Sequence, residues 1–126
     1  MIGRGRACGK VILYGEHFVL YGGTAIAVPL YSAFLQVLVA VDPDGGRTIE
    51  SPFLEVDLGR SLLDMATREL ALDPTEGLRA EVTGDLPVGM GLGSSAALCV
   101  ALARALIDLY GEPPDEDRVS MAAFEM

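Results

Sequence analysis

The first 50 residues alternate between short apolar runs and turn signals, a pattern that predicts β-strands. The expected strands are residues 6–14, 24–30, 33–41 and 47–50. The sequence DPDGG at 42–46 is typical of a tight turn, so we expect the last two strands to pair around it as a hairpin. Residues 15–23 are expected to form a loop.

After residue 50 the pattern of apolar positions changes in two steps. Residues 53–58 still alternate between apolar and polar, and we expect a short strand there, before helical spacing begins. Apolar residues then recur every three or four positions from Leu58 to Leu72, which predicts a helix. The remaining expected elements are a strand at 78–83, a helix from Ser94 to Tyr110, and a helix that starts at Asp115 and still runs at Met126. Gly111 and the prolines after it are expected to end the second helix.

The composition fits one acidic globular domain. The chain has 126 residues, 51% of them hydrophobic, which is enough for a buried core. Its formal net charge of −9 argues against a general nucleic-acid or anionic-membrane surface. Residues 1–41 nevertheless carry three basic residues against one acid. An anionic ligand would therefore find its most favourable field near the N-terminal strand.

Cysteine usage and the apolar runs predict a cytoplasmic protein. The two cysteines, Cys8 and Cys99, are too few for a disulfide framework, so we expect a reducing compartment. No signal-peptide core is recognisable near the N-terminus. The longest apolar stretch, 24–41, is interrupted by Pro29 and polar residues, so we interpret it as strands and not as a membrane span.

The most informative segment is PVGMGLGSSAA at 87–97, which precedes the alanine-rich helix. It holds alternating glycines and two serines: Gly89, Gly91, Gly93, Ser94 and Ser95. Glycines let the backbone approach a ligand closely, and a helix that starts there directs free N–H groups and the positive end of its dipole toward the loop. This combination favours a phosphate group. The serine hydroxyls add ligands for phosphate or Mg²⁺.

Two other interpretations of this segment stay open. GLGSSA matches the short dinucleotide-binding pattern, but Pro87 breaks the strand before it, and the nearest acid downstream, Asp108, lies within the helix. The segment could also be a glycine-rich turn without a ligand, which three alternating glycines and two serines fit poorly. It is not a Walker A loop, because no lysine follows the last glycine.

A second segment, GKVILYGEHFVLYG at 9–22, combines three chemical groups at the end of one strand. Lys10 lies within the expected strand, while Glu16 and His17 follow directly after it. Taken singly, each would be interpreted as a surface lysine or a loop residue. Together they place a cation, an acid and an imidazole in the only basic part of the chain.

The two segments, in this order, resemble the two first motifs of the GHMP kinase superfamily. Within it, GEH followed by FVLYG is most similar to the mevalonate kinases. The resemblance implies that residues 1–126 form the N-terminal, ATP-binding domain, with the catalytic aspartate lying beyond Met126. We therefore expect a truncated domain that is inactive alone and self-associates through an open sheet edge and uncovered apolar faces.

The resemblance also implies a fold and a reaction. The fold would be α+β, with a mixed, mainly antiparallel sheet and helices on one face, similar to domain 2 of ribosomal protein S5. The intact enzyme would transfer the γ-phosphoryl of ATP to the C5 hydroxyl of mevalonate, with Mg²⁺. The implied site residues are Lys10 (catalysis), Glu16 and His17 (substrate), Gly89, Met90, Gly91, Leu92, Gly93, Ser94 and Ser95 (ATP), and Ser95 again (metal).

Two alternatives remain within this resemblance. The acceptor could be phosphomevalonate, homoserine or a sugar. The chain could also be a non-catalytic nucleotide-binding module. In each case the expected partner is a small molecule, with no nucleic acid and no membrane.

Overall fold

The computed structural model describes residues 1–14, 22–24, 26–51, 56–72, 76–87 and 92–125. Its elements are β1 (Ile2–Tyr14), β2 (Ile26–Val41), β3 (Arg47–Glu50), α1 (Val56–Glu69), β4 (Leu78–Gly84), α2 (Ser94–Leu109) and α3 (Glu116–Glu125). None of the described helices is long and apolar enough to cross a membrane.

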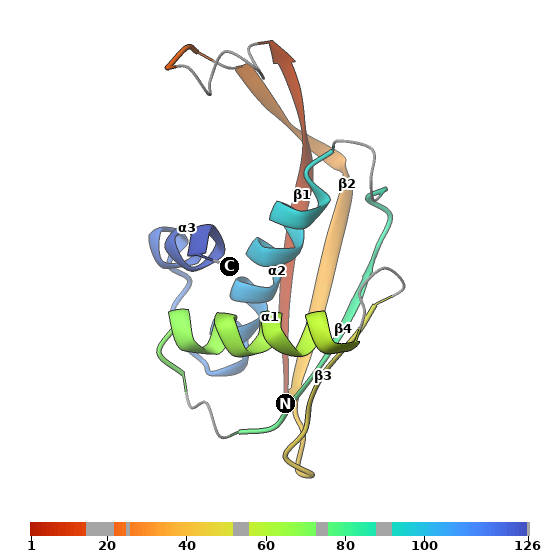
Figure 1. Cartoon of the computed structure of the whole chain (residues 1–126), viewed down its shortest axis with the longest axis vertical. Helices are drawn as coiled ribbons and strands as arrows, with labels where there is room; N and C mark the ends of the chain where they lie inside the picture. The colour runs from red at the N-terminus through yellow and green to blue at the C-terminus, as the bar shows by residue number, and fades with distance from the viewer. Residues whose placement is uncertain (15–21, 25, 52–55, 73–75, 88–91, 126) are drawn as a thin grey trace.

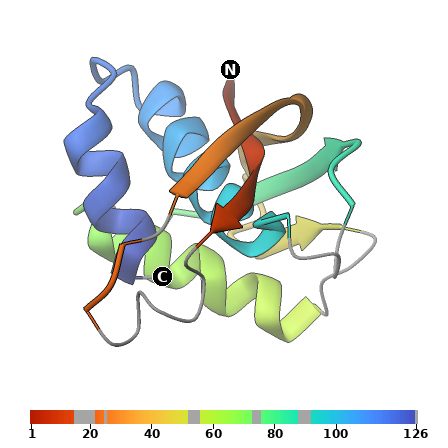
Figure 2. The same cartoon turned by 90° about the horizontal axis from the view of Figure 1, so that it is seen from above.

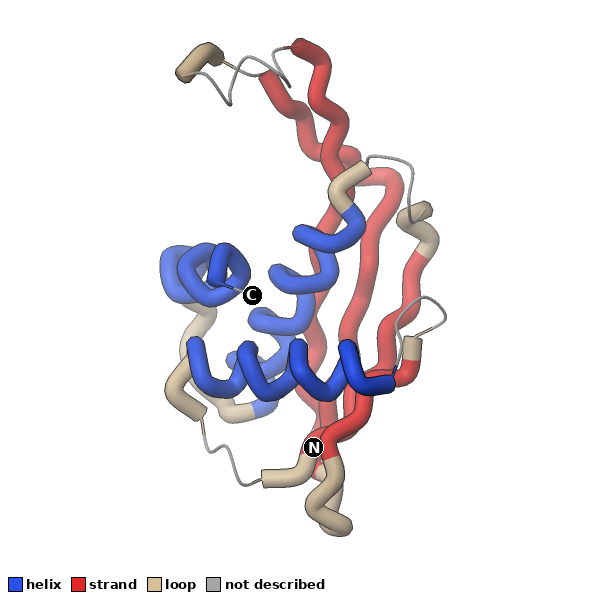
Figure 3. The backbone as a smooth tube through the Cα atoms, viewed as in Figure 1, coloured by secondary structure: helices blue, strands red, loops and turns tan. Residues whose placement is uncertain are grey.

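The strands form one sheet in the order β1-β2-β4-β3 (Figure 1). β1 pairs antiparallel with β2, and β2 pairs antiparallel with β4. β3 and β4 are parallel and are joined through α1, the crossover that parallel neighbours require. The helices lie on one side of the sheet (Figure 3), and α3 lies far from β3 and β4 (Figure 2). The expected α+β fold with a mixed, mainly antiparallel sheet is confirmed.

The expected hairpin of 33–41 with 47–50 is wrong, because β4 lies between these two strands. The turn itself forms as expected: the Gly45 N–H donates to the Asp42 carbonyl at 3.1 Å. The strands on either side of this turn, β2 and β3, do not pair with each other, and Gly77, just before β4, lies between them. A Cβ on Gly77 would lie 2.4 Å from the Asp42 carbonyl oxygen, so only glycine fits at the point where β4 enters.

Three further boundaries differ from the expectations. The strands expected at 24–30 and 33–41 are one strand, β2, with an irregularity opposite Cys8 and Gly9. β1 begins at Ile2, four residues before the expected start. The short strand expected at 53–58 is wrong at its end, because α1 begins at Val56; its residues 53–55 lie outside the described residues.

The helix ends follow the sequence signals closely. Gly111 adopts φ 69°, and its N–H donates to the Asp108 carbonyl at 3.1 Å. The Glu112 N–H donates to the Ile107 carbonyl at 3.2 Å, which completes a Schellman motif at the end of α2. Asp115 caps α3 as expected, because its carboxylate accepts the Arg118 N–H at 3.2 Å.

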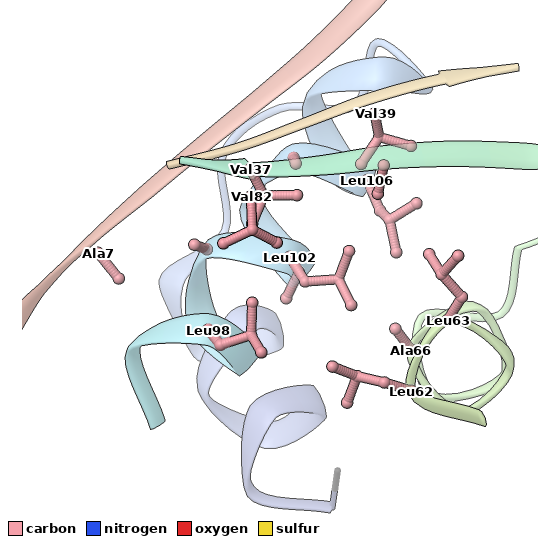
Figure 4. Packing of buried hydrophobic residues seen from close by; sticks show 14 of the residues in the cluster. Ala7, Val37, Val39, Leu62, Leu63, Ala66, Val82, Leu98, Leu102 and Leu106 are labelled. Atoms are coloured by element: carbon pink, nitrogen blue, oxygen red, sulfur yellow. The ribbon is translucent and has the colours of Figure 1, made fainter. Parts of the chain in front are cut away.

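The core lies between the sheet and the helices. Alternate residues of β2 point into it, as the two-residue period of a strand dictates. Leucines at every fourth position of α2 face this strand surface, and α1 closes the other side (Figure 4). The labelled core residues are Ala7, Val37, Val39 and Val82 from the sheet, Leu98, Leu102 and Leu106 from α2, and Leu62, Leu63 and Ala66 from α1.

The contact that fixes the site is the close approach of α2 to β1. Glycines at alternate positions of β1 are buried against the helix backbone. A Cβ on Gly3 would lie 2.2 Å from the Ala105 carbonyl oxygen, and one on Gly5 would lie 2.0 Å from the Ala101 carbonyl oxygen. Any side chain at these positions would push the helix away from the strand.

Gly5→Ala is expected to lower the free energy of unfolding by about 3 kcal/mol, because the new methyl group meets rigid backbone that cannot rotate away. Gly46→Ala is the matched control. There a Cβ would meet only the Asp42 carboxylate, at 3.7 Å, so a change within about 0.5 kcal/mol is expected. Urea unfolding followed by circular dichroism measures both. Equal losses would show that β1 and α2 can separate without penalty.

Candidate functional site

The two motif segments meet where α2 begins. The Lys10 N–H of β1 donates to the Leu92 carbonyl at 2.9 Å. Gly9 permits this contact, because a Cβ there would lie 2.8 Å from the same oxygen and 2.5 Å from a methyl group of Leu86. The start of α2 thus lies beside β1, below the part of the β1–β2 ribbon that extends beyond the helices (Figure 1).

Gly93 links the loop to the helix and touches the lysine side chain. It is the N-cap of α2 and adopts the left-handed conformation, with φ 74° and ψ 31°. Its carbonyl accepts the first helical hydrogen bond, from the Ala97 N–H at 2.9 Å. A Cβ on Gly93 would lie 2.9 Å from Cγ and 3.2 Å from Cε of Lys10. The backbone conformation and the lysine stem therefore both require glycine here.

The first turn of α2 offers donors without an anionic partner from its own residues. Among the described residues no side chain caps its N-terminus, and its first turn contains no acidic residue. Ser94 is half-buried and Ser95 is exposed. The N-terminal end of a helix carries about half a positive charge, which disfavours a cation nearby. The stem of Lys10 nevertheless packs at this end, so two positive features converge and an anion between them would be stabilised by both.

A shallow groove of about 200 Å³ runs along this contact. Its lining residues are Ala7, Cys8, Lys10, Gly93, Ala96, Ala97, Val100 and Arg104. Three larger hollows of about 610, 370 and 260 Å³ lie over residues 112–118, between β1, α2 and α3, and beside Tyr31 and Phe34 of β2. None of the three is lined by Lys10 or Gly93, so the groove is the hollow that matches the sequence motifs.

The two cysteines are free thiols, as expected. Burial raises the pKa of the Cys99 thiol, which keeps it protonated and unreactive at neutral pH. Within the described part of the chain, no cluster of three or more histidine, cysteine, aspartate or glutamate side chains could hold a metal ion.

Five of the site residues expected from the sequence lie outside the described residues: Glu16, His17, Gly89, Met90 and Gly91. The others, Lys10, Leu92, Gly93, Ser94 and Ser95, come together at the start of α2. Sequence reasoning missed Arg104, which lines the same groove from the second half of α2. The signal available was its spacing of four from Asp108, on a helix that is otherwise almost entirely apolar.

The family model for the GHMP kinases N terminal domain matches residues 60–126, just over half of the chain. The chain therefore belongs to the GHMP kinase family. This agrees with the fold and with the glycine-rich loop ahead of α2, and it removes the dinucleotide-binding interpretation, which requires a doubly wound parallel sheet.

Several relatives are mevalonate kinases. The mevalonate kinase of Pyrococcus horikoshii is 33% identical, over 81% of this chain and 37% of its own length. The structure of L. major mevalonate kinase in complex with R-mevalonate superimposes with a TM-score of 0.82 at 28% identity, over 98% of this chain and 40% of that one. Mevalonate kinase from methicillin-resistant Staphylococcus aureus is 32% identical, with a TM-score of 0.70, over 96% and 43%. The chain thus spans about two fifths of these relatives.

Gly93→Ala is expected to disturb the Lys10 contact, and Gly22→Ala is its matched control. Both glycines have positive φ, so alanine costs about 1 kcal/mol of strain at either position. Only at Gly93 would the Cβ also meet the lysine stem, whereas nothing lies within 4 Å at Gly22. We expect faster hydrogen exchange at the Lys10 amide in Gly93→Ala alone. Equal exchange in the two variants would contradict this packing.

Proposed function

We propose that the protein is an ATP-dependent, cytoplasmic kinase that transfers the γ-phosphoryl group of ATP to the C5 hydroxyl of mevalonate. The observation that carries the proposal is the convergence of Lys10 with the uncapped N-terminus of α2. The names of the relatives support mevalonate as the acceptor. Phosphoryl transfer depends mainly on positioning and charge stabilisation, which are the properties that this site offers.

The phosphates of ATP would be held by backbone N–H groups between Gly89 and Ser95, at the start of α2. A nearby anion gains roughly 0.3–2 kcal/mol from the helix dipole. Most residues in the middle of α2 are buried, whereas Ser95 and Ala96 in its first turn are exposed, so this turn is open to a ligand. Gly93, in its left-handed conformation, lines the groove together with Ala96 and Ala97 of that turn.

Lys10 would stabilise the charge that develops as the phosphoryl group moves. Its stem packs against Gly93, its main chain bonds to Leu92, and the residue lines the groove, so the ammonium group would lie near the start of α2. Such preorganised charges are worth more than mobile ones, because they need no rearrangement in the transition state. Glu16 and His17 would bind the acceptor alcohol. The resemblance assigns the general base to an aspartate beyond Met126.

Mg²⁺ would bind mainly to the phosphate oxygens and water, with the Ser95 hydroxyl as a ligand from this chain. Mg²⁺ keeps several waters and uses few protein ligands in kinase sites. An exposed serine in the first turn of α2 fits this role, and the described residues hold no carboxylate cluster for it. The metal would neutralise phosphate charge, while the helix and Lys10 orient the nucleotide.

The protein encoded by the complete gene is expected to release ADP with mevalonate and much less with phosphomevalonate, homoserine or galactose. A coupled ADP-release assay measures this preference. Preference for another acceptor would reassign the enzyme within the family, and binding of ATP without turnover would favour a non-catalytic module. The 126 residues alone are expected to bind ATP weakly without turnover, which calorimetry and the same assay would check.

Lys10→Met and Ser95→Ala are expected to affect different steps. Lys10→Met keeps the stem on Gly93 and removes the charge, so kcat should fall by roughly 10²-fold or more at saturating Mg²⁺. Ser95→Ala should raise the Mg²⁺ concentration needed for half-maximal rate, and its kcat at saturating Mg²⁺ should stay above that of Lys10→Met. Near-normal turnover of Lys10→Met would remove it from catalysis, and an unchanged Mg²⁺ titration would remove Ser95 from the metal site.

A further inference from the structure

The surface on which α2 rests against β1 is unusually smooth. Small residues alternate along the strand: Gly3, Gly5, Ala7 and Gly9. Alanines recur at every fourth position of the helix: Ala97, Ala101 and Ala105. Helices are normally held along their axes by side-chain ridges that enter grooves. A glycine surface has no ridges, so this contact resists small displacements of α2 along β1 only weakly.

Two hydrogen bonds at the outer edge of β1 hold the helix along its axis. The Nη1 group of Arg104 donates to the Arg6 carbonyl at 2.6 Å. The Oδ2 atom of Asp108 accepts the Arg4 N–H at 2.9 Å. β2 lies on the opposite side of β1, so these main-chain groups do not belong to the sheet ladder. Both bonds tie α2 directly to the strand that carries Lys10.

The spacing of these bonds matches the geometry of the two elements. Two residues of a strand span about 6.6 Å, and four residues of a helix span about 6 Å. Arg4 and Arg6 therefore face Asp108 and Arg104 in one register, with β1 and α2 running in opposite directions. A hydrogen bond weakens steeply once the atoms separate by more than about 3.5 Å. The pair of bonds thus favours one axial position of α2 on β1.

Such precision matters at the other end of the helix. Any axial shift of α2 moves Gly93 relative to Lys10 by the same amount, because a helix is stiff along its length. Displacements of about 1 Å at a phosphoryl-transfer site reduce the rate strongly. Arg104 also lines the groove beside Lys10 and Gly93, so its side chain connects the edge of β1 to the candidate site.

We infer that Arg104 and Asp108 are positioning residues, which set the axial position of α2 on β1 and thereby hold the phosphate-binding loop against Lys10. They act through the backbone of β1, to which both side chains are hydrogen-bonded. The significance for catalysis rests on the proposed kinase function. The mechanical coupling between the two ends of α2 does not, so the two can be tested separately.

The first test is amide hydrogen exchange in the 126-residue chain, followed by NMR. In Arg104→Met, which keeps the apolar stem, exchange of the Lys10 N–H should accelerate roughly three- to tenfold relative to the Ala80 N–H in the middle of β4. General destabilisation would raise both rates equally and leave their ratio unchanged. An unchanged ratio would overturn the inference.

Two variants serve as controls. Glu116→Gln weakens the other partner of Arg104, an ion pair at 2.7 Å with α3, and leaves the bond to Arg6 in place. It should not change the Lys10 to Ala80 ratio; an increase equal to that of Arg104→Met would assign the effect to α3 and reject the inference. Arg104→Lys keeps one donor for the Arg6 carbonyl and should restore a ratio close to that of the wild type.

The second test uses the complete enzyme. Arg104→Met and, independently, Asp108→Ala should raise the KM for ATP roughly three- to tenfold, with the KM for the acceptor alcohol unchanged. A merely structural role would lower the active fraction and leave the KM for ATP unaltered, and that result would reject the inference. If the wild type shows no ATP-dependent turnover, the kinase proposal fails, and the exchange ratio still decides the coupling. If Arg104→Met does not fold, Asp108→Ala decides it.

Discussion

The close contact between β1 and α2 is the constraint on which the site depends. Helices usually pack about 10 Å from a strand layer, with side chains between them. Here carbonyl oxygens of α2 lie 2.2 and 2.0 Å from where the Cβ atoms of Gly3 and Gly5 would be. The backbone of the helix therefore rests directly on the strand. This is why an amide of β1 can reach the loop before the helix, as the Lys10 to Leu92 bond shows.

α2 packs closely against β1 on one side and, through longer side chains, against β2 and α1 on the other. Alanines form its side toward β1, and leucines one position further along form its side toward β2 and α1: Leu98, Leu102 and Leu106 (Figure 4). The leucines bury apolar surface, which stabilises the fold by about 25 cal/mol per Å². The small side chains of the alanines let α2 approach β1 closely. Hydrophobic stabilisation and placement of the site thus come from adjacent faces of one element.

The sequence predicted where each helix and strand lies along the chain much better than which elements lie side by side in the fold. The limits of α2 and the cap at Asp115 follow from local signals, so they could be predicted residue by residue. The false hairpin shows the limit, because a turn such as DPDGG does not reveal that a third strand enters between its arms; only the clash that a side chain at Gly77 would make explains it. The alternating glycines of β1 were visible as a pattern, but their meaning depends on which helix packs there.

The fold places the basic and the acidic parts of the chain at opposite ends of α2. α2 is apolar through most of its length, so it separates the basic strand end at Lys10 from the acids that follow its C-terminus, Glu112 and Asp115 to Asp117. Acids beside the negative end of a helix are unfavourable, and two arginines compensate: Arg118 pairs with Glu112, and Arg104 pairs with Glu116. No such compensation exists among the described residues at the other end, where the stem of Lys10 packs against the positive end of the helix. One end of α2 is therefore electrostatically satisfied within the protein, and the other is most stable when an anion binds.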